Sequence, residues 1–403
     1  MTSRRGARTW LAITGVRVGN WLSRRAGRGA GTVVGGSIGL AIDHDLLAKL
    51  AVGRTVAVVS GTNGKTTTTA LIVAGWGGQV ATNQTGSNMP AGHVAALVRS
   101  GEPRVVLECD EAWLGTVVTA LRPVVTVLLN LSRDQLDRSS EVRQLAERWR
   151  KALEGAPPTS TVVANARDPL VVHAASGVAN VVWCAVPSTW IADTQSCPRC
   201  TAPIRHDAEA WWCECGFRQP VASSYLTGSD VVVNGEALPL ALSLPGSFNR
   251  GNALLALSAL RALGVAPRDA AARLATVRDV AGRYAIRRVG DQVVRLLLAK
   301  NPAGFAATLA DVVGDAPLWI AINANVADGQ DPSWLYDVPF EVLRGRTVWC
   351  LGTRRLDLAA RLWYAHVDAA VVDEGLPPTH DGVVDVIANY TAFSDLLKVA
   401  EPC

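Results

Sequence analysis

The 403-residue sequence lacks several features that would assign it to a common class. Charged residues make up only 18%, and a net charge of +4 does not by itself indicate nucleic-acid binding. No apolar run reaches the roughly 18 residues that a membrane-spanning helix needs. The first eight residues are basic, but no apolar segment with a small-residue cleavage site follows, so we expect no secretory signal. These absences favour the cytoplasm, where thiols stay reduced and clustered cysteines indicate a metal site.

A phosphate-binding loop is the strongest feature that is present. An apolar strand segment at 56–59 is followed by Gly61-Thr62-Asn63-Gly64-Lys65-Thr66-Thr67 and then by a helical stretch of small residues. The two glycines let backbone N–H groups point inward, and the following helix adds its positive N-terminal end. Lys65 supplies a charge for the outer phosphates and Thr66 a hydroxyl for Mg²⁺. The loop is a variant, because Val59 replaces the usual first glycine. It predicts ATP or GTP binding.

The rest of the chain alternates apolar strand segments with helical stretches. Apolar segments that end in polar residues recur at 104–114, 123–137 and 160–169. Continuous apolar strands separated by helices predict a parallel sheet with helices on both faces. Ligands bind at the carboxyl ends of such strands, where these polar clusters fall. A second α/β unit is expected from about residue 292.

Four cysteines interrupt this pattern. Cys197 and Cys200 form a C-x-x-C pair, and Cys213 and Cys215 form a C-x-C pair twelve residues further on. Four thiolates can complete a tetrahedral zinc shell with no position left for chemistry, so we predict a structural zinc ribbon. A redox dithiol and a nucleic-acid-binding ribbon are the alternatives. The segment 194–220 contains three arginines, Arg199, Arg205 and Arg218, and three acidic residues, Asp207, Glu209 and Glu214, and this charge balance disfavours nucleic-acid binding.

The first 45 residues combine arginines with large apolar residues. The arginines are Arg4, Arg5, Arg8, Arg17, Arg24, Arg25 and Arg28, and the apolar residues include Trp10, Leu11, Val18, Trp21 and Leu22. A helix with one apolar and one basic face can lie on an anionic membrane surface. The alternative is a helix packed on the main domain with solvated arginines.

Several motifs together carry a family resemblance. Besides the phosphate loop, they are the segments 130–138 (NLSRDQLDR), 165–169 (NARDP), 246–256 (GSFNRGNALLA) and 282–284 (GRY). In combination they resemble the Mur ligase superfamily, whose members join an amine to a carboxylate through an acyl phosphate, using ATP and Mg²⁺. Phe248 stands where that family commonly has histidine.

Two features narrow the resemblance. The phosphate loop opens at Gly61, which leaves no room for the N-terminal module of the ordinary peptidoglycan ligases, and a zinc ribbon interrupts the central domain. Together with the segments 298–305, 323–341, 351–355 and 388–393, these features resemble the ligase subunits of lipid II isoglutaminyl synthase. The implied fold class is α/β: a Mur ligase-type central P-loop ATPase domain with an inserted four-cysteine zinc ribbon, plus a Rossmann-like α/β C-terminal domain. We expect a basic N-terminal segment at 1–45, the central domain at 46–288 with the insert at 190–225, and the C-terminal domain at 289–403.

The resemblance also implies an activity and a partner. It implies ATP-dependent amidation of the D-glutamate α-carboxylate in the lipid II stem peptide, giving D-isoglutamine by way of an acyl phosphate. Ammonia would come from a GatD-type glutaminase subunit in a heterodimer. The implied cofactors are ATP, Mg²⁺ and structural Zn²⁺, the implied location is the cytoplasm at the inner membrane face, and no nucleic acid is expected. The alternative is a stand-alone amino acid ligase of the Mur or folylpolyglutamate type.

The same resemblance assigns site residues. ATP and Mg²⁺ are expected at Gly61, Thr62, Asn63, Gly64, Lys65, Thr66, Thr67, Glu108, Asn249, Asn252 and Asn301, with Lys65 and Glu108 also catalytic. Glu108 would bind a Mg²⁺ between ATP and the carboxylate, and Asp110 and Glu111 are its close alternatives.

Asp331 is the third residue assigned to catalysis. It would orient a histidine of the partner's Cys-His pair, as the third member of a triad does. Asp328 and Asp337 are the neighbours with which it can be confused. The alternative is an aspartate in a glycine turn.

Further polar residues are expected to shape the site. They are Asn130, Arg133, Asp134, Asp137, Asn165, Asp168 and Lys300. For Asp134, capping of a helix is an equal alternative.

Overall fold

The computed structural model describes residues 6–25, 32–83, 87–133, 142–188, 190–278, 280, 282–312 and 316–402. Three helices precede the first strand: α1 (Ala7–Arg25), α2 (Thr32–Ile42) and α3 (Leu46–Ala51). Among the described residues, no helix combines the length and the apolar character needed to cross a membrane.

A nine-stranded sheet forms the centre of the molecule. Its strands are β1 (Thr55–Ser60), β2 (Ala81–Thr82), β3 (Arg104–Cys109), β4 (Val125–Leu128), β5 (Thr161–Asn165), β6 (Val181–Ala185), β9 (Ser224–Thr227), β10 (Asp230–Val233) and β11 (Glu236–Pro239), in the order β11-β10-β9-β6-β5-β4-β1-β3-β2. Neighbours from β2 to β9 pair parallel, whereas β9, β10 and β11 pair antiparallel. The expected parallel sheet is therefore present, with an antiparallel extension at one edge.

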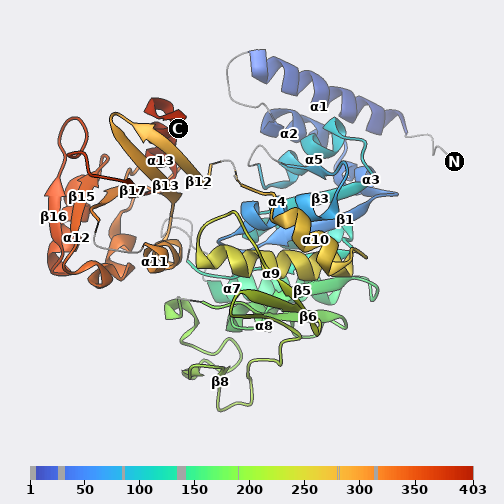
Figure 1. The fold of residues 1–403 in the computed structure, drawn as a ribbon. Helices are drawn as coiled ribbons and strands as arrows, with labels where there is room; N and C mark the ends of the chain where they lie inside the picture. Colours follow the sequence, from blue (N-terminus) through green and yellow to red (C-terminus); the bar gives the residue numbers. More distant parts are fainter. Residues whose placement is uncertain are drawn as a thin grey trace.

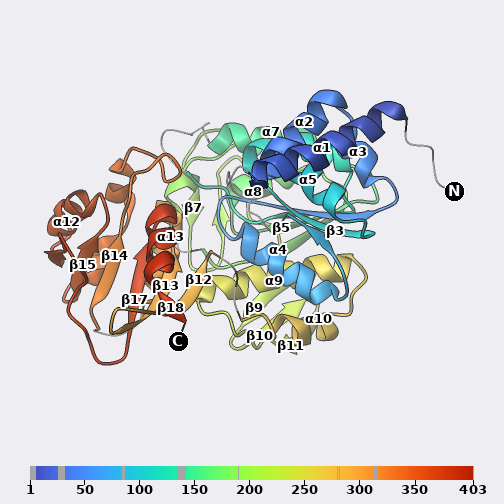
Figure 2. The same ribbon diagram turned by 90° about the horizontal axis from the view of Figure 1, so that it is seen from above.

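Helices cover both faces of this sheet. One face carries α5 (Pro90–Arg99), α6 (Leu114–Leu121), α7 (Val142–Glu154) and α8 (Pro169–Ala175), and the other carries α4 (Lys65–Trp76), α9 (Ser247–Ala262) and α10 (Pro267–Leu274) (Figure 2). Alternate residues of β1 enter the two cores, since Val58 belongs to the cluster of α5 and α7 and Val59 to the cluster of α4 and α9. Because β1 is buried on both of its faces, its sequence is apolar without interruption.

The cysteine-rich insert lies between β6 and β9. It contains η3 (Ala192–Thr194) and a small antiparallel pair, β7 (Arg205–His206) with β8 (Trp211–Trp212), and it projects from the central domain (Figure 1). The Trp211 indole N–H donates to the Ala166 carbonyl at 3.0 Å, which fixes the insert beside the end of β5. Because β9 begins at Ser224 within the main sheet, the insert ends slightly before the expected residue 225.

A second sheet of seven strands follows. Its strands are β12 (Tyr284–Val289), β13 (Gln292–Leu298), β14 (Leu318–Ala321), β15 (Thr347–Leu351), β16 (Asp368–Val371), β17 (Val383–Ala388) and β18 (Glu401–Pro402), in the order β16-β15-β14-β17-β13-β12-β18. The helices are α11 (Pro302–Asp311), α12 (Arg355–Tyr364) and α13 (Tyr390–Val399), with two short 3-10 helices, η4 (Ser333–Asp337) and η5 (Phe340–Leu343). β12 pairs antiparallel with β13, so the expected boundary at 288–289 would cut this hairpin. Because β12 pairs within the second sheet, the second unit begins with that strand, at Tyr284.

The contacts between the two units include several polar ones. The Asn63 and Asn301 side-chain amides exchange two hydrogen bonds of 3.1 and 3.2 Å. The Ser247 backbone N–H donates to the Asp311 carboxylate, and Arg133 pairs with Asp337 at 3.4 Å. The second unit is thereby held against the carboxyl edge of the central sheet.

Candidate active site

The phosphate loop joins β1 to α4 with its glycines in conformations that other residues rarely adopt. Gly64 has φ +88° and Gly61 has φ +145°. A Cβ atom on Gly64 would lie 2.5 Å from the Asn252 side-chain oxygen, so any side chain there would have to displace Asn252 of α9. The Thr62 N–H donates to the Asn130 carbonyl at 2.9 Å, which ties the loop to the end of β4.

Lys65 lies under this loop and is buried. Its ammonium donates to the carbonyls of Gly61 and Thr62 at 2.5 and 3.2 Å, and it forms an ion pair of 2.9 Å with Glu111. The sequence offered Glu111 as an alternative magnesium ligand, and in the structure it is the partner of the lysine instead.

Glu108 is the penultimate residue of β3, and its side chain lies beside the start of α4. Its carboxylate accepts a hydrogen bond of 2.8 Å from the Thr66 hydroxyl, which in turn accepts one of 2.9 Å from Arg283. The structure therefore brings together two of the residues that the sequence assigned to Mg²⁺. Arg283 lies directly before β12, in the motif at 282–284, and the sequence assigned it no role. A hard carboxylate beside a hydroxyl provides the oxygen ligands that Mg²⁺ prefers.

Two buried residues that the sequence did not single out hold the Glu108 backbone. The Asn83 amide bonds to both the N–H and the carbonyl of Glu108 at 2.9 Å, and His93 Nε2 bonds to the same carbonyl at 2.8 Å. The carbonyl can only accept, so Nε2 carries the proton. Burial lowers the pKa of His93 to about 4, although the bond to Glu108 raises it, so the ring is neutral at physiological pH. No spacing in the sequence links either residue to Glu108.

The Asn130 side chain is hydrogen-bonded to the backbone of the phosphate loop. Its side-chain oxygen accepts from the Asn63 N–H at 2.9 Å, and its amide donates to the Asn63 carbonyl at 3.0 Å. The Asn63 side chain continues to Asn301, which also caps α11 by accepting from the Gly304 N–H. Asn301 therefore reaches the phosphate loop, where the sequence placed it.

Asp168 organises the neighbouring strand end. Its carboxylate accepts backbone N–H groups of Leu170 and Val171 at the start of α8 and of Leu131 after β4. Burial raises the pKa of Asp168 to about 6, against these three hydrogen bonds, which lower it. Asn165 accepts from the Arg167 N–H at 3.0 Å. Both side chains thus shape loops that line the site.

At the start of α9, Asn249 donates to the Pro245 carbonyl at 2.5 Å and accepts from Asn252 at 3.1 Å.

A cavity of about 460 Å³ is bounded by these asparagines, the phosphate loop, Glu108 and the second unit. Its lining includes Thr62, Asn63, Gly64, Lys65, Thr66, Thr67, Asp110, Asn130, Asn165, Asp168, Phe248, Arg283, Lys300 and Gly304. Asp110 also caps η1 (Glu111–Trp113) by accepting from Ala112. Asp134 and Asp137 lie outside the described residues.

Asp331 lies outside this cavity, on the surface of the second unit. Its carboxylate accepts from the Ser333 N–H at 2.8 Å, and this hydrogen bond lowers its pKa. Its two neighbours differ clearly from it. Asp328 is buried and bonds to the backbone of Asn325 and Thr391, whereas Asp337 pairs with Arg133.

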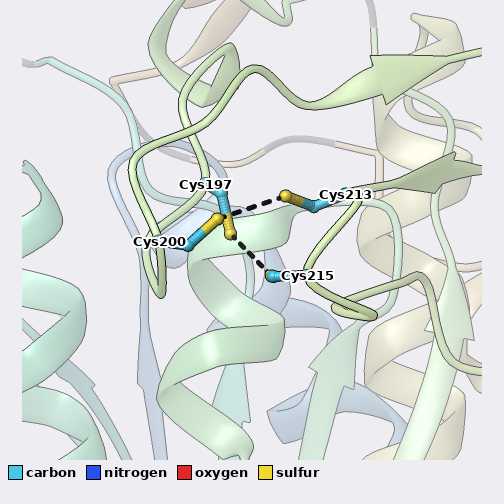
Figure 3. Close-up of side chains that lie close together, drawn as sticks. All are labelled: Cys197, Cys200, Cys213 and Cys215. Carbon is cyan, nitrogen blue, oxygen red and sulfur yellow. Dashed lines mark hydrogen bonds between the residues drawn. The ribbon is translucent and has the colours of Figure 1, made fainter.

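The four cysteines of the insert converge (Figure 3). All four sulfur atoms lie within 4.8 Å of one another, with Cys197–Cys215 at 3.8 Å and Cys200–Cys213 at 3.4 Å. These separations exceed the roughly 2.05 Å of a disulfide bond. A tetrahedron with Zn–S bonds of about 2.3 Å has an edge of about 3.8 Å. The Cys197–Cys215 separation equals this edge, and the Cys200–Cys213 separation of 3.4 Å is somewhat shorter. The donor set therefore fits a closed four-thiolate metal site, as a structural or a nucleic-acid-binding ribbon would have, whereas a redox dithiol would need only one pair of cysteines.

Comparison with known proteins agrees with this geometry. Residues 59–260 match the Mur ligase middle domain, and residues 298–393 match the MurT ligase C-terminal domain. The lipid II isoglutaminyl synthase (glutamine-hydrolysing) subunit MurT of Staphylococcus aureus (strain COL) is 29% identical over 97% of each chain. The subunit of the same name from Streptococcus pneumoniae (strain ATCC BAA-255 / R6) is 30% identical over 88% of this chain and 86% of its own. Among solved structures, a pseudomurein peptide ligase type C from Methanothermus fervidus has a TM-score of 0.69 at 18% identity, covering 88% of this chain and 80% of its own.

The phosphate loop facing a buried carboxylate, with a second α/β unit closing the cavity, defines a ligase of the Mur type. Within that class, the chain belongs to the MurT family.

Gly64→Ala tests whether the loop binds nucleotide. We expect nucleotide affinity to fall at least about tenfold, because the new Cβ meets Asn252 and the positive φ costs roughly 1–2 kcal/mol. Gly53→Ala is the matched control, since Gly53 also has positive φ but the structure describes no atom within 4 Å of the added Cβ. Isothermal titration with ATP and Mg²⁺ measures both. Unchanged affinity in a folded Gly64→Ala protein would show that the phosphates bind elsewhere.

Cys200→Ser tests the metal site. We expect about one zinc ion per wild-type chain, and loss of this ion together with a lower free energy of unfolding in the variant, because a small insert has little core of its own. Elemental analysis and chemical denaturation measure these quantities. Cys350→Ala, which removes a buried thiol outside the cluster, should keep the metal. Equal zinc content in wild type and Cys200→Ser would contradict the assignment.

Proposed function

We propose that this chain is the synthetase subunit of a glutamine-dependent amidotransferase that amidates lipid II. In the proposed reaction, an oxygen of the D-glutamate α-carboxylate attacks the γ-phosphorus of ATP, and ADP leaves. Ammonia then attacks the carbonyl carbon of the acyl phosphate, phosphate leaves, and loss of a proton from nitrogen gives the D-isoglutamine amide. The observation that carries the proposal is the cavity where the phosphate loop and the buried Glu108 meet. The two relatives named as MurT supply the substrate class.

The residues around the loop have complementary roles in this proposal. The loop N–H groups and Lys65 bind the phosphates, and an incoming phosphate competes with Glu111 for the ammonium. Thr66 and Glu108 would hold Mg²⁺, which when bound neutralises negative charge on the transferred phosphoryl group. Arg283, 2.9 Å from the Thr66 hydroxyl, adds positive charge from the second unit. Because Asn83 and His93 fix its backbone, Glu108 presents its carboxylate in one position.

Ammonia would be supplied by a partner glutaminase, and the second unit offers a surface for it. Tyr336, Trp363 and Tyr364 are all largely exposed. The Tyr364 ring contacts Trp363 edge-on, with ring centroids 5.0 Å apart, and lies tilted against Tyr336 at 6.3 Å. Exposed aromatic clusters are typical of protein interfaces. Tyr336 lies in η4, five residues after Asp331. We propose that this surface binds the glutaminase and that ionised Asp331 orients a histidine of its catalytic pair. The proposed place of the complex is the cytoplasm, where ATP is available.

Free ammonia makes the synthetase testable without the partner. Lipid II incubated with this chain, ATP, Mg²⁺ and ammonium at raised pH should gain an amide in place of a carboxylate, detected by mass spectrometry. Lys65→Ala should lower the rate at least about 100-fold, because it removes a charge where negative charge develops. Lys398→Ala is the control, since Lys398 is a surface residue that pairs with Asp395.

Removal of Lys65 also leaves Glu111 buried without its cation. The double variant Lys65→Ala/Glu111→Gln should restore stability without restoring activity, which separates loss of function from loss of fold. If wild type adds a free amino acid and no ammonia, the chain is a stand-alone amino acid ligase and the proposal is wrong.

Asp331→Asn separates the two nitrogen sources. With the glutaminase present, glutamine-driven amidation should fall roughly 10²–10⁴-fold, the scale on which catalytic triads depend on their third member. Ammonia-driven amidation should be unchanged, because Asp331 lies outside the cavity. Asp337→Asn should keep both rates near wild type. If Asp337→Asn lost glutamine-driven amidation and Asp331→Asn did not, the role would belong to Asp337.

A further inference from the structure

Helix α1 directs its large apolar side chains away from the protein. Trp10, Leu11, Val18, Trp21 and Leu22 are each 50–63% exposed. Spacings of three, four and seven residues place them in one stripe along the helix. The buried residues of α1 are instead the small or short Thr9, Ala12, Val16, Gly19 and Ser23. This is the reverse of the usual pattern, in which large apolar residues face the core.

Close packing against α2 explains why the helix cannot turn this stripe inward. A Cβ atom on Gly19 would lie 2.9 Å from the Gly35 Cα, and one on Gly39 would lie 2.4 Å from a Val16 methyl group. α2 in turn contacts α5 closely, since a Cβ on Gly36 would lie 1.8 Å from the Ala91 carbonyl. The inner face of α1 therefore has room only for small side chains. We define the outward stripe of Trp10, Leu11, Val18, Trp21 and Leu22 as the α1 apolar face.

The charge of this region is strongly positive. Residues 1–42 contain seven arginines and no acidic residue, a charge of +7, whereas the whole chain has +4, so the remainder carries −3. The first acidic residue, Asp43, is buried and pairs with Lys49 at 2.8 Å. Arg25 lies 4.8 Å over the ring of Trp21, at one end of the α1 apolar face. Of these arginines, Arg8, Arg17, Arg24 and Arg25 lie on α1 itself, on the same helix as the exposed apolar residues.

We propose that the α1 apolar face inserts into the surface of an anionic lipid membrane, with the surrounding arginines on the lipid headgroups. Tryptophan and arginine are the residues that favour the boundary between headgroups and acyl chains. Nucleic acid would satisfy the arginines and leave the apolar face in water, and a second copy of the chain would bring like charges together. Anionic lipid satisfies both features. Where the proposed function holds, this contact also brings the active site to a lipid-linked substrate.

Vesicle binding tests this inference without substrate, nucleotide or partner, so its failure is distinct from failure of the amidation reaction. The full chain is sedimented with vesicles of phosphatidylcholine alone or with about one third phosphatidylglycerol. We expect binding to the anionic vesicles and at least about tenfold weaker binding to the neutral ones. The double variant Trp10→Ser/Trp21→Ser should bind anionic vesicles at least about tenfold more weakly than wild type. Arg17→Gln/Arg24→Gln/Arg25→Gln should also bind anionic vesicles at least about tenfold more weakly, because each basic residue near the surface adds attraction to anionic lipid.

Trp363→Ser is the matched control, since it removes a 70% exposed tryptophan from the second unit and should leave vesicle binding unchanged. Circular dichroism and thermal unfolding check that the α1 variants keep their fold, which is expected because the substituted tryptophans are at least half exposed. Wild-type binding by the folded tryptophan double variant would overturn the proposal. So would a wild-type dimer that becomes a monomer in this variant and binds no vesicles, since the face would then join two copies. Binding to nucleic acid that depends on the arginines alone, without vesicle binding, would overturn it as well.

Discussion

Parallel pairing of β1 with β3 on one side and β4 on the other is the constraint on which the site depends. In this register Ser60 lies opposite both Cys109 and Leu128, so three strands end side by side. The loop after β1, Glu108 near the end of β3 and Asn130 after β4 therefore meet at one edge. A slip of one residue in either pairing would turn the side chains of that strand to the opposite face and separate these groups.

The second unit completes a site that the central sheet begins. Its contributions are Arg283 before β12 and Asn301 at the start of α11, and both reach residues of the phosphate loop or of the helix behind it. Polar contacts such as these are typical of interfaces between domains that move relative to one another when ligands bind. The cavity is thus bounded on one side by the carboxyl edge of the central sheet and on the other by side chains of the second unit.

Two surfaces outside the cavity lie at opposite ends of the molecule. Helix α1 is on the far side of the central domain from α12, which carries Trp363 and Tyr364 (Figure 1, Figure 2). A lipid surface at one end and a protein partner at the other would therefore not compete for space. The four-cysteine cluster is a third feature, and it lies in the insert that the Trp211–Ala166 hydrogen bond holds beside the end of β5.

The sequence by itself determined the elements whose signals are local. The glycines and lysine of the phosphate loop, the apolar strands and the paired cysteines are each contained in a short segment, and the fold class, the loop and the cysteine cluster could be predicted from them. Tertiary structure alone decided which distant groups meet. Lys65 pairs with Glu111, the backbone of Glu108 is held by Asn83 and His93, and β12 joins the second sheet. The sequence could not predict these contacts because they depend on strand register and burial. The outward direction of the α1 apolar face has the same origin. The sequence left open whether this helix packs on the main domain or has an exposed apolar face, and the close glycine contacts with α2 determine which side faces water.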